Sequence, residues 1–206
     1  MPWLRAHGVR FVLLAVLAEL CVFVAFGHTS QYAPSLLAAK FVWYPLYLLL
    51  PAVTSCAIGL GLSRVPASLE QVPNRSTAAL AAVFVAAPVT LKCALVLVLG
   101  LYMPNPQVHG YLVNTALFVG LTIALPFTAR RTVWIPVVAF YLCVFLGSTG
   151  DSVLPWAVLA RPSPGPGTMA ASVGVLVLAL GLLPLRCRAR RSAPVRASGR
   201  RSDAGE

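Results

Sequence analysis

The sequence predicts an all-α, polytopic integral membrane protein with six transmembrane helices and both termini on the cytoplasmic side. Of its 206 residues, 59% are hydrophobic and only 10% are charged, whereas the surface of a soluble domain needs roughly a quarter charged residues. The apolar runs are continuous and near twenty residues long, the length that a helix needs to cross a bilayer. A transmembrane barrel would instead show shorter segments of alternating polarity.

Six apolar runs are candidates for the spans, and polar segments separate them. The predicted spans cover residues 10–27, 41–62, 77–102, 111–127, 132–147 and 168–185. The first run follows two arginines and resembles a signal peptide. Glu19 interrupts it and no A-x-A cleavage site follows, so we expect an uncleaved first helix.

The distribution of arginine and lysine supports this count, because short cytoplasmic loops of membrane proteins are enriched in these residues. With six spans, one side holds only two cations between the spans, Lys40 and Arg161. Five or seven spans would break this alternation. The other side holds the seven arginines of the tail together with Arg5, Arg10, Arg64, Arg75, Arg130 and Arg131.

The basic tail, residues 186–206, lacks hydrophobic periodicity and is predicted to be disordered after its first few residues. It accounts for much of the net charge of +11. Its expected partners are anionic lipid headgroups. Nucleic-acid binding is not expected, because the tail has no aromatic residues interleaved with its cations. The many arginines, alanines, prolines and glycines indicate a GC-rich bacterial gene, hence a protein of the cell (inner) membrane.

A short match suggests a three-plus-three inverted repeat. The letters KFVWYP at residues 40–45 and RTVWIP at residues 131–136 share a basic-x-Val-Trp-x-Pro pattern at an offset of 91. Inverted repeats are typical of secondary transporters. The alternative is that tryptophan and a cation near a helix start are ordinary interfacial anchors.

Glu19 and Lys92 are the two charged side chains well inside the predicted spans, and they have opposite signs. Each alone would cost about 2.5–3.5 kcal/mol in a membrane, so both should face protein or a wet cavity. Helical rise puts Lys92 about 9 Å further along its span than Glu19, so contact between them is an open hypothesis. The pair would be either a substrate or ion-coupling site, or a structural element that fixes helix packing.

Pro88 precedes Lys92 by one turn on the same predicted helix face. A proline inside a helix removes its own N–H donor and frees the carbonyl of the residue four positions earlier. We therefore expect a kink near Lys92, which would place a polar carbonyl close to the ammonium group.

The long segment between the fifth and sixth spans has an apolar centre, LPWAVLA, bracketed by Asp151 and Arg161. It is too short to cross a bilayer and too apolar for a simple loop. We predict a re-entrant or interfacial segment with Trp156 at the level of the lipid headgroups.

The sequence offers little for catalysis. It has no zinc-protease, nucleophile-elbow or phosphate-loop motif, and it has five acidic residues in total. His28 and His109 are isolated, and the five cysteines show no ligand spacing. An enzyme is therefore disfavoured, and no cofactor and no metal are expected.

In its general layout the chain resembles the permease subunits of ABC-2-type exporters. The likeness lies in the basic start at residues 5–10, the short fifth span at residues 132–147 and the apolar outer segment at residues 154–160. The resemblance implies a separate cytoplasmic ATPase that would contact a coupling helix, for which residues 66–75 are the candidate.

These observations predict a membrane transport component, either a permease subunit or a small secondary carrier. The proposed polar intramembrane site comprises Glu19 and Lys92. The alternative is a non-transporting scaffold or accessory subunit, in which the two residues only stabilise helix packing.

Overall fold

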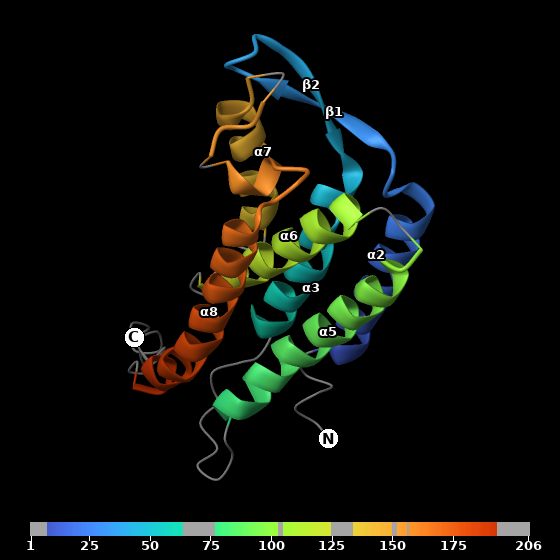
Figure 1. Cartoon of the computed structure of the whole chain (residues 1–206). Helices are drawn as coiled ribbons and strands as arrows, with labels where there is room; N and C mark the ends of the chain where they lie inside the picture. Colours follow the sequence, from blue (N-terminus) through green and yellow to red (C-terminus); the bar gives the residue numbers. More distant parts are fainter. Residues whose placement is uncertain are drawn as a thin grey trace, which may run out of the picture.

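The computed structural model describes residues 8–63, 77–102, 105–124, 134–149, 152–155 and 157–192. These residues are mostly helical, with one β-hairpin at one end of a helical bundle (Figure 1). The first turn of α2 and the last turns of α8 lie at the opposite end (Figure 1). We call these two ends the hairpin end and the terminal end. The elements are α2 (Val9–Phe26), β1 (Ser30–Ser35), β2 (Lys40–Pro45), η1 (Leu46–Leu48), α3 (Pro51–Ser63), α5 (Thr77–Leu99), α6 (Asn105–Ala124), α7 (Ile135–Gly147), η3 (Val158–Ala160) and α8 (Pro166–Ser192).

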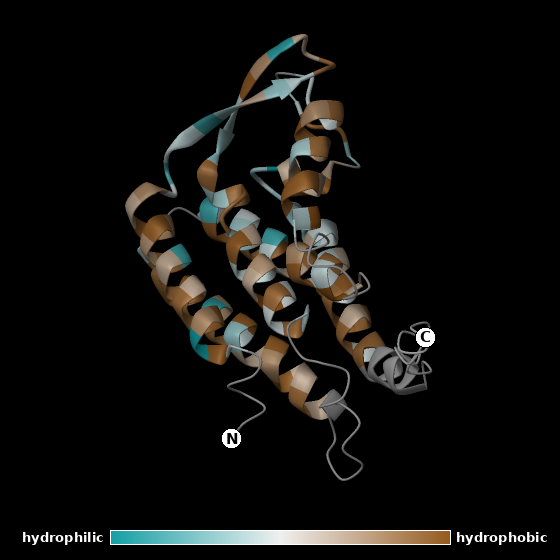
Figure 2. Cartoon of the chain, turned by 180° about the vertical axis from the view of Figure 1, so that it is seen from behind, coloured by the Kyte–Doolittle hydropathy of each residue, from teal (hydrophilic) through white to brown (hydrophobic). Residues whose placement is uncertain are grey.

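Four helical segments in the described part of the chain are long and apolar enough to cross a membrane. They are Val9–Phe26, Leu46–Ser63, Ala79–Leu99 and Pro166–Leu183. Their large apolar side chains remain exposed along the bundle, for example Leu14 at 65% and Leu178 at 68%. Figure 2 shows these apolar stretches along the outer faces of the helices. Such an exposed apolar surface is compatible with a lipid environment.

Helix α6 is the central helix of the bundle, and it packs most extensively against α8 and α3. Most of its described side chains are buried, including the polar residues Asn114, Thr115 and Thr122. Because neighbouring helices cover it, its sequence can be less apolar than that of a lipid-facing helix. It also begins earlier than the predicted span 111–127, so His109 lies within the helix.

The β-hairpin corrects the all-α prediction. Residues 41–45 were expected to begin a helix, but they belong to strand β2. This strand pairs antiparallel with β1, and Tyr32 lies opposite Trp43. The aromatic and β-branched residues of Phe41–Tyr44 suit a strand, and Pro45 disfavours a helical conformation at the residue before it. The helical part of this span starts only at η1.

The hairpin also removes support for the inverted repeat. Trp43 lies within strand β2, whereas its counterpart Trp134 is the N-cap of helix α7. The two matched segments therefore have different backbone structures where both are described. The shared letters reflect similar composition and not a shared fold.

Two further boundaries differ from the predictions. Helix α7 has only 13 residues, about 20 Å at the helical rise per residue, which is shorter than the roughly 30 Å hydrocarbon core. Helix α8 continues to Ser192, seven residues beyond the predicted end of the last span. Arginine and alanine are good helix formers, which explains this extension into the basic region. The remainder of the tail lies outside the described residues.

The buried apolar residues form two clusters, one toward each end of the bundle. On α2, Val12 belongs to the cluster at the terminal end and Leu20 to the cluster at the hairpin end. On α5 the corresponding residues are Val89 and Val96. The boundary between the clusters therefore lies near the middle of both helices, where the two buried charges also lie.

Candidate functional site

Glu19 and Lys92 form a fully buried ion pair inside the bundle. Glu19 lies on α2 and Lys92 on α5, and the distance from Lys92 Nζ to Glu19 Oε1 is 2.5 Å. Both side chains are completely shielded from solvent. The contact that the sequence left open is thus present. The expected 9 Å offset is wrong because α5 begins further toward the terminal end than α2 does (Figure 1).

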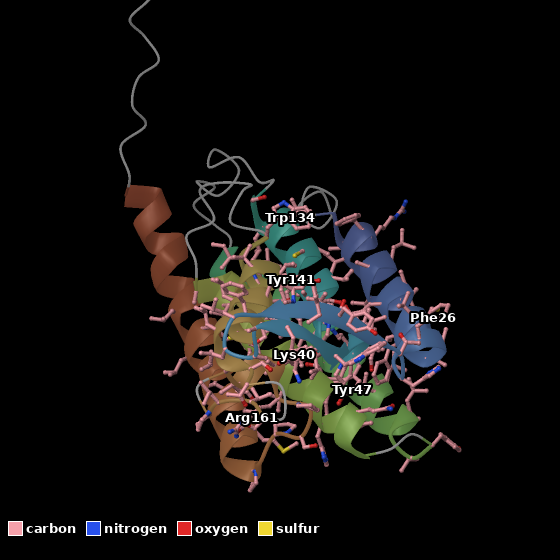
Figure 3. All side chains as sticks on the ribbon, turned by 90° about the horizontal axis from the view of Figure 1, so that it is seen from above. Phe26, Lys40, Tyr47, Trp134, Tyr141 and Arg161 are labelled. Atoms are coloured by element: carbon pink, nitrogen blue, oxygen red, sulfur yellow. The ribbon has the colours of Figure 1, made fainter. Side chains whose placement is uncertain are left out.

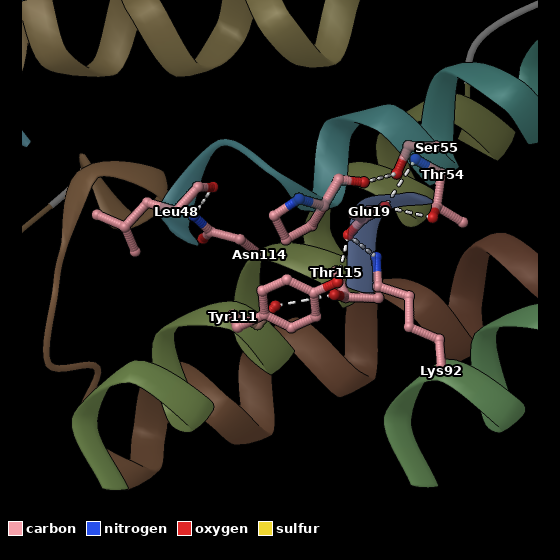
Figure 4. A network of polar contacts seen from close by, with 9 residues as sticks. Glu19, Leu48, Thr54, Ser55, Lys92, Tyr111, Asn114 and Thr115 are labelled. Atoms are coloured by element: carbon pink, nitrogen blue, oxygen red, sulfur yellow. Dashed lines mark hydrogen bonds and ion pairs between the residues drawn. The ribbon is translucent and has the colours of Figure 1, made fainter. Parts of the chain in front are cut away.

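The Glu19 carboxylate has three hydrogen-bond donors besides Lys92. The backbone N–H of Thr54 donates to Oε2 at 3.0 Å, and the Thr54 hydroxyl donates to the same oxygen. The Tyr111 hydroxyl donates to Oε1. Figure 4 shows these groups converging from four helices, α2, α3, α5 and α6. Both carboxylate oxygens are therefore well satisfied, as a buried charge requires.

The backbone donor of Thr54 is available because of its position in α3. Thr54 is the fourth residue of this helix, and the first four N–H groups of a helix have no partner within it. The N-terminal end of a helix also carries a partial positive charge that stabilises a nearby anion. Glu19, from another helix, thus acts as an N-terminal cap for α3.

Lys92 contacts Tyr111 as well as Glu19. Its ammonium lies 4.8 Å from the centre of the Tyr111 ring, close enough for a cation–π interaction. Beyond the ion pair with Glu19, Nζ has no hydrogen-bond acceptor among the described residues. An ammonium carries three donors, so Lys92 is less well satisfied than its partner carboxylate.

Tyr111 is held in place by neighbours on both sides. Its ring packs against Phe23 with 4.5 Å between ring centres. Its backbone carbonyl accepts a hydrogen bond from the Thr115 hydroxyl at 2.8 Å. Tyr111 is itself fully buried. The phenol is therefore a fixed donor to Glu19, and the site is organised without any ligand.

Pro88 lies within α5, one turn before Lys92, and is buried. Together with Val12 and Phe84 it lines an apolar cavity of about 220 Å³ between α2 and α5. The cavity is lined entirely by apolar residues. The polar partner that the structure gives Lys92 is the Glu19 carboxylate, across the helix interface.

The predicted outer site residues do not join the central site. Asp151 and Trp156 lie outside the described residues. Arg161, labelled in Figure 3, directly follows the short helix η3 and lines a pocket with residues of strand β2 at the hairpin end. The coupling-helix candidate, residues 66–75, is likewise outside the described part of the chain.

The segment around η3 packs against α7 and α6, and whether it is re-entrant or interfacial in a membrane stays a prediction. Ala157 and Ala160 are fully buried, and Leu159 is only 6% exposed. The side-chain amide of Asn114 donates to the Leu159 carbonyl at 2.8 Å and to the Leu48 carbonyl at 2.7 Å. Asn114 thereby satisfies one carbonyl in each of the short 3-10 helices η1 and η3 and ties the two together.

Thr54, Tyr111 and Asn114 are important polar residues that the sequence analysis did not single out. All three are polar side chains within or beside apolar runs, which is the signal that could have revealed them. Their partners could not be predicted, because each contact joins residues far apart in the chain. Thr54, for example, follows Glu19 by 35 positions.

No protein-family model, curated protein or solved structure matches this chain. Within the described residues, no group of three histidine, cysteine or acidic side chains could hold a metal ion. The case for a function therefore depends on the geometry of the buried pair and its surroundings.

Proposed function

We propose that this chain is a membrane transport component whose coupling site is the Glu19–Lys92 pair. The observation that carries the proposal is a fully shielded carboxylate and ammonium, 2.5 Å apart, joined to four helices at the middle of the bundle. Ionisable residues inside membrane proteins are costly and commonly mark ion or substrate pathways. The pair joins α2 and α5 inside the bundle, away from both helix ends, and transporters commonly bind their substrates near the bilayer midplane.

The chemistry of the pair supports coupling to a cation or a proton. A cation that reaches Glu19 would compete with Lys92 for the carboxylate. Protonation of Glu19 would remove the attraction for Lys92 and weaken its hold on Thr54 and Tyr111. Because the carboxylate links α2 to α3, α5 and α6, either event would loosen the contacts between these helices.

We further propose six membrane crossings, with both termini in the cytoplasm of a bacterial cell and the protein in its inner membrane. The arginine distribution supports this orientation. The common position of the α2 start and the α8 end also supports it (Figure 1). Reporter fusions test it: phosphatase fused after Ala38, in the hairpin turn, should be active, and phosphatase fused after Ser192 should be inactive. The reverse pattern would refute the orientation.

An accessory scaffold is the second candidate, and one observation favours it. The carboxylate of Glu19 already has its full set of partners, and neither charged side chain reaches solvent. In this hypothesis the ion pair has a purely structural role and holds four helices together. In that case a substitution of Glu19 or Lys92 would lower the activity of the complex only as far as it lowers the thermal stability of the protein.

The decisive experiment compares function and stability in a set of matched variants. Glu19→Gln removes the charge but keeps the side-chain shape, and the exchanged pair Glu19→Lys with Lys92→Glu keeps both charges. Purified protein in proteoliposomes is challenged on solid-supported membranes with amino acids, small carboxylates, nucleosides and cationic dyes, and the transient currents are recorded. Thermal unfolding is measured in parallel. A Leu178→Ala variant on the exposed face of α8 is the control.

Glu19→Gln leaves the buried Lys92 ammonium without its counter-charge, so its unfolding temperature should fall. A transport site predicts that substrate-induced currents disappear in Glu19→Gln and also in the double variant Glu19→Gln with Lys92→Met, in which much of the stability returns. Leu178→Ala should retain the currents. If the wild-type protein gives no current with any probe, or if the exchanged pair retains full current, the coupling role is refuted. A permease subunit further predicts that an ATPase co-purifies with the chain from its native membrane.

A further inference from the structure

A pocket of about 340 Å³ opens at the hairpin end of the molecule, separate from the central ion pair. Its walls come from strand β2, the end of α7 and the segment after η3. This volume is at the lower end of the range for small-molecule sites. The lining residues are Val42, Trp43, Tyr44, Ser148, Ser152, Val153, Arg161, Pro162 and Ser163.

The pocket combines one cation with hydroxyl groups and an apolar wall. Arg161 is half-buried and forms no ion pair with any described residue. Val42, Val153 and Pro162 supply apolar surface. Trp43 also lines the pocket, and its ring contacts Tyr32 on the neighbouring strand, with ring centres 3.7 Å apart. The wall is therefore mixed, with at least as much polar as apolar surface, which suits a ligand that carries a charged group on a small apolar body.

Tyr44 provides an independent indication that a polar ligand fits here. Its side chain is 2% exposed, and its hydroxyl has no hydrogen-bond partner of good geometry among the described residues. Burial raises the pKa of the Tyr44 phenol, and the neighbouring Ser148 opposes part of that shift. The phenol is therefore a neutral donor. The Tyr44 hydroxyl lies beside Ser148, and a bound acceptor would give it a hydrogen bond of better geometry.

We propose that this pocket binds the oxyanion of a small, partly apolar molecule, with Arg161 as the charged ligand and the Tyr44 hydroxyl as a second donor. A guanidinium presents paired N–H donors that match carboxylate and phosphate oxygens. Val42, Val153 and Pro162 would cover the apolar part. The oxyanion comes either from a soluble metabolite or from a lipid headgroup. This proposal stands apart from the coupling role of Glu19.

Binding to purified protein in detergent tests the proposal directly. The probes are benzoate and phenyl phosphate, with benzyl alcohol as the neutral counterpart, and isothermal titration calorimetry measures saturable binding. Dioleoylphosphatidylglycerol is added in a separate arm, and native mass spectrometry counts the lipid retained. Binding of the soluble anions identifies a metabolite site, and retention of the lipid alone identifies a headgroup site.

Three variants test which groups bind the anion. Arg161→Gln should weaken binding of the responding anion about tenfold or more, because a hydrogen-bonded charge is lost. Tyr44→Phe should weaken it about threefold to tenfold. Lys40→Gln is the matched control, since Lys40 is an exposed cation on the same strand that does not line the pocket. It should change binding by less than about twofold.

Three results would overturn the proposal. The first is the absence of saturable binding or retention for every anion. The second is an equal loss in Lys40→Gln and Arg161→Gln, which would indicate general charge attraction. The third is binding that appears only in Asp151→Asn, which would show that an internal carboxylate occupies Arg161. Thermal unfolding of each variant shows that the comparison concerns folded protein.

Discussion

Buried polar groups find their partners differently at the centre of the bundle and at its hairpin end. At the centre, a carboxylate and an ammonium neutralise each other, and Thr54 and Tyr111 satisfy the remaining lone pairs. At the hairpin end, Asn114 satisfies two backbone carbonyls, while Arg161 has no described counter-charge. The centre is closed and its two charges neutralise each other, whereas the hairpin end is open and its cation Arg161 has no described counter-charge.

This difference shows which region can respond to a ligand directly. A complete, shielded network must break existing interactions before it can bind anything, so any coupling at Glu19 requires helix movement. The pocket at Arg161 can accept a ligand without rearrangement. Asn114 lies one turn beyond Tyr111 on α6, so a single helix carries contacts from both regions.

The largest effect should come from removing one member of the central pair. Lys92→Met leaves the Glu19 carboxylate buried without its counter-charge, which typically costs about 3–5 kcal/mol. The thermal unfolding temperature in detergent should fall accordingly. The double variant with Glu19→Gln should recover much of the loss, because no isolated charge remains. If the single and double variants are equally unstable, the two residues are not energetically coupled.

A smaller loss should follow from Asn114→Leu at the hairpin end. The substitution leaves the carbonyls of Leu48 and Leu159 without their donor, at a cost of about 2–4 kcal/mol for two buried acceptors. Hydrogen exchange should speed up in residues 157–162, and α3 near Thr54 should keep its protection. Equal loss of protection in both regions would show that the centre and the hairpin end open together.

The smallest effect should come from Gly110→Ala, which tests the close packing between the two regions. An added Cβ would lie 2.9 Å from the Tyr47 ring and 3.1 Å from the Pro162 carbonyl, so a destabilisation of about 1–3 kcal/mol is expected. Gly174→Ala is the matched control, since its Cβ would meet nothing within 4 Å. It should leave the unfolding temperature unchanged or slightly raised. If Gly110→Ala and Gly174→Ala have the same unfolding temperature, Gly110 does not pack closely against Tyr47 and Pro162.

The sequence predicted the membrane character and the positions of the two central charges, because a charged residue in an apolar run is conspicuous. It did not predict their contact, since the relative heights of α2 and α5 depend on how the helices pack. Thr54 and Tyr111 were not identified for the same reason. Threonine and tyrosine are common in apolar helices, and only the hydrogen bonds to Glu19 distinguish these two residues.

The hairpin end was predicted less well, and its composition explains why. Residues 41–45 are as apolar as the helix that follows, and hydropathy alone cannot separate a strand from the start of a helix. The role of Asn114 depends on two carbonyls from distant segments. The pocket around Arg161 arises from three segments that only the tertiary structure brings together.

The order in which the chain is made gives the buried pair a further consequence. Helix α2 leaves the ribosome first and carries Glu19, but its donors come later: Thr54 follows by 35 residues and Tyr111 by 92. Until Lys92 on α5 has also been synthesised, the first helix bears an unpaired acid with an insertion cost of about 2.5–3.5 kcal/mol. If α2 spans a membrane, we therefore expect its position there to become more stable once α5 supplies the counter-charge, which would couple insertion of α2 to folding of the bundle.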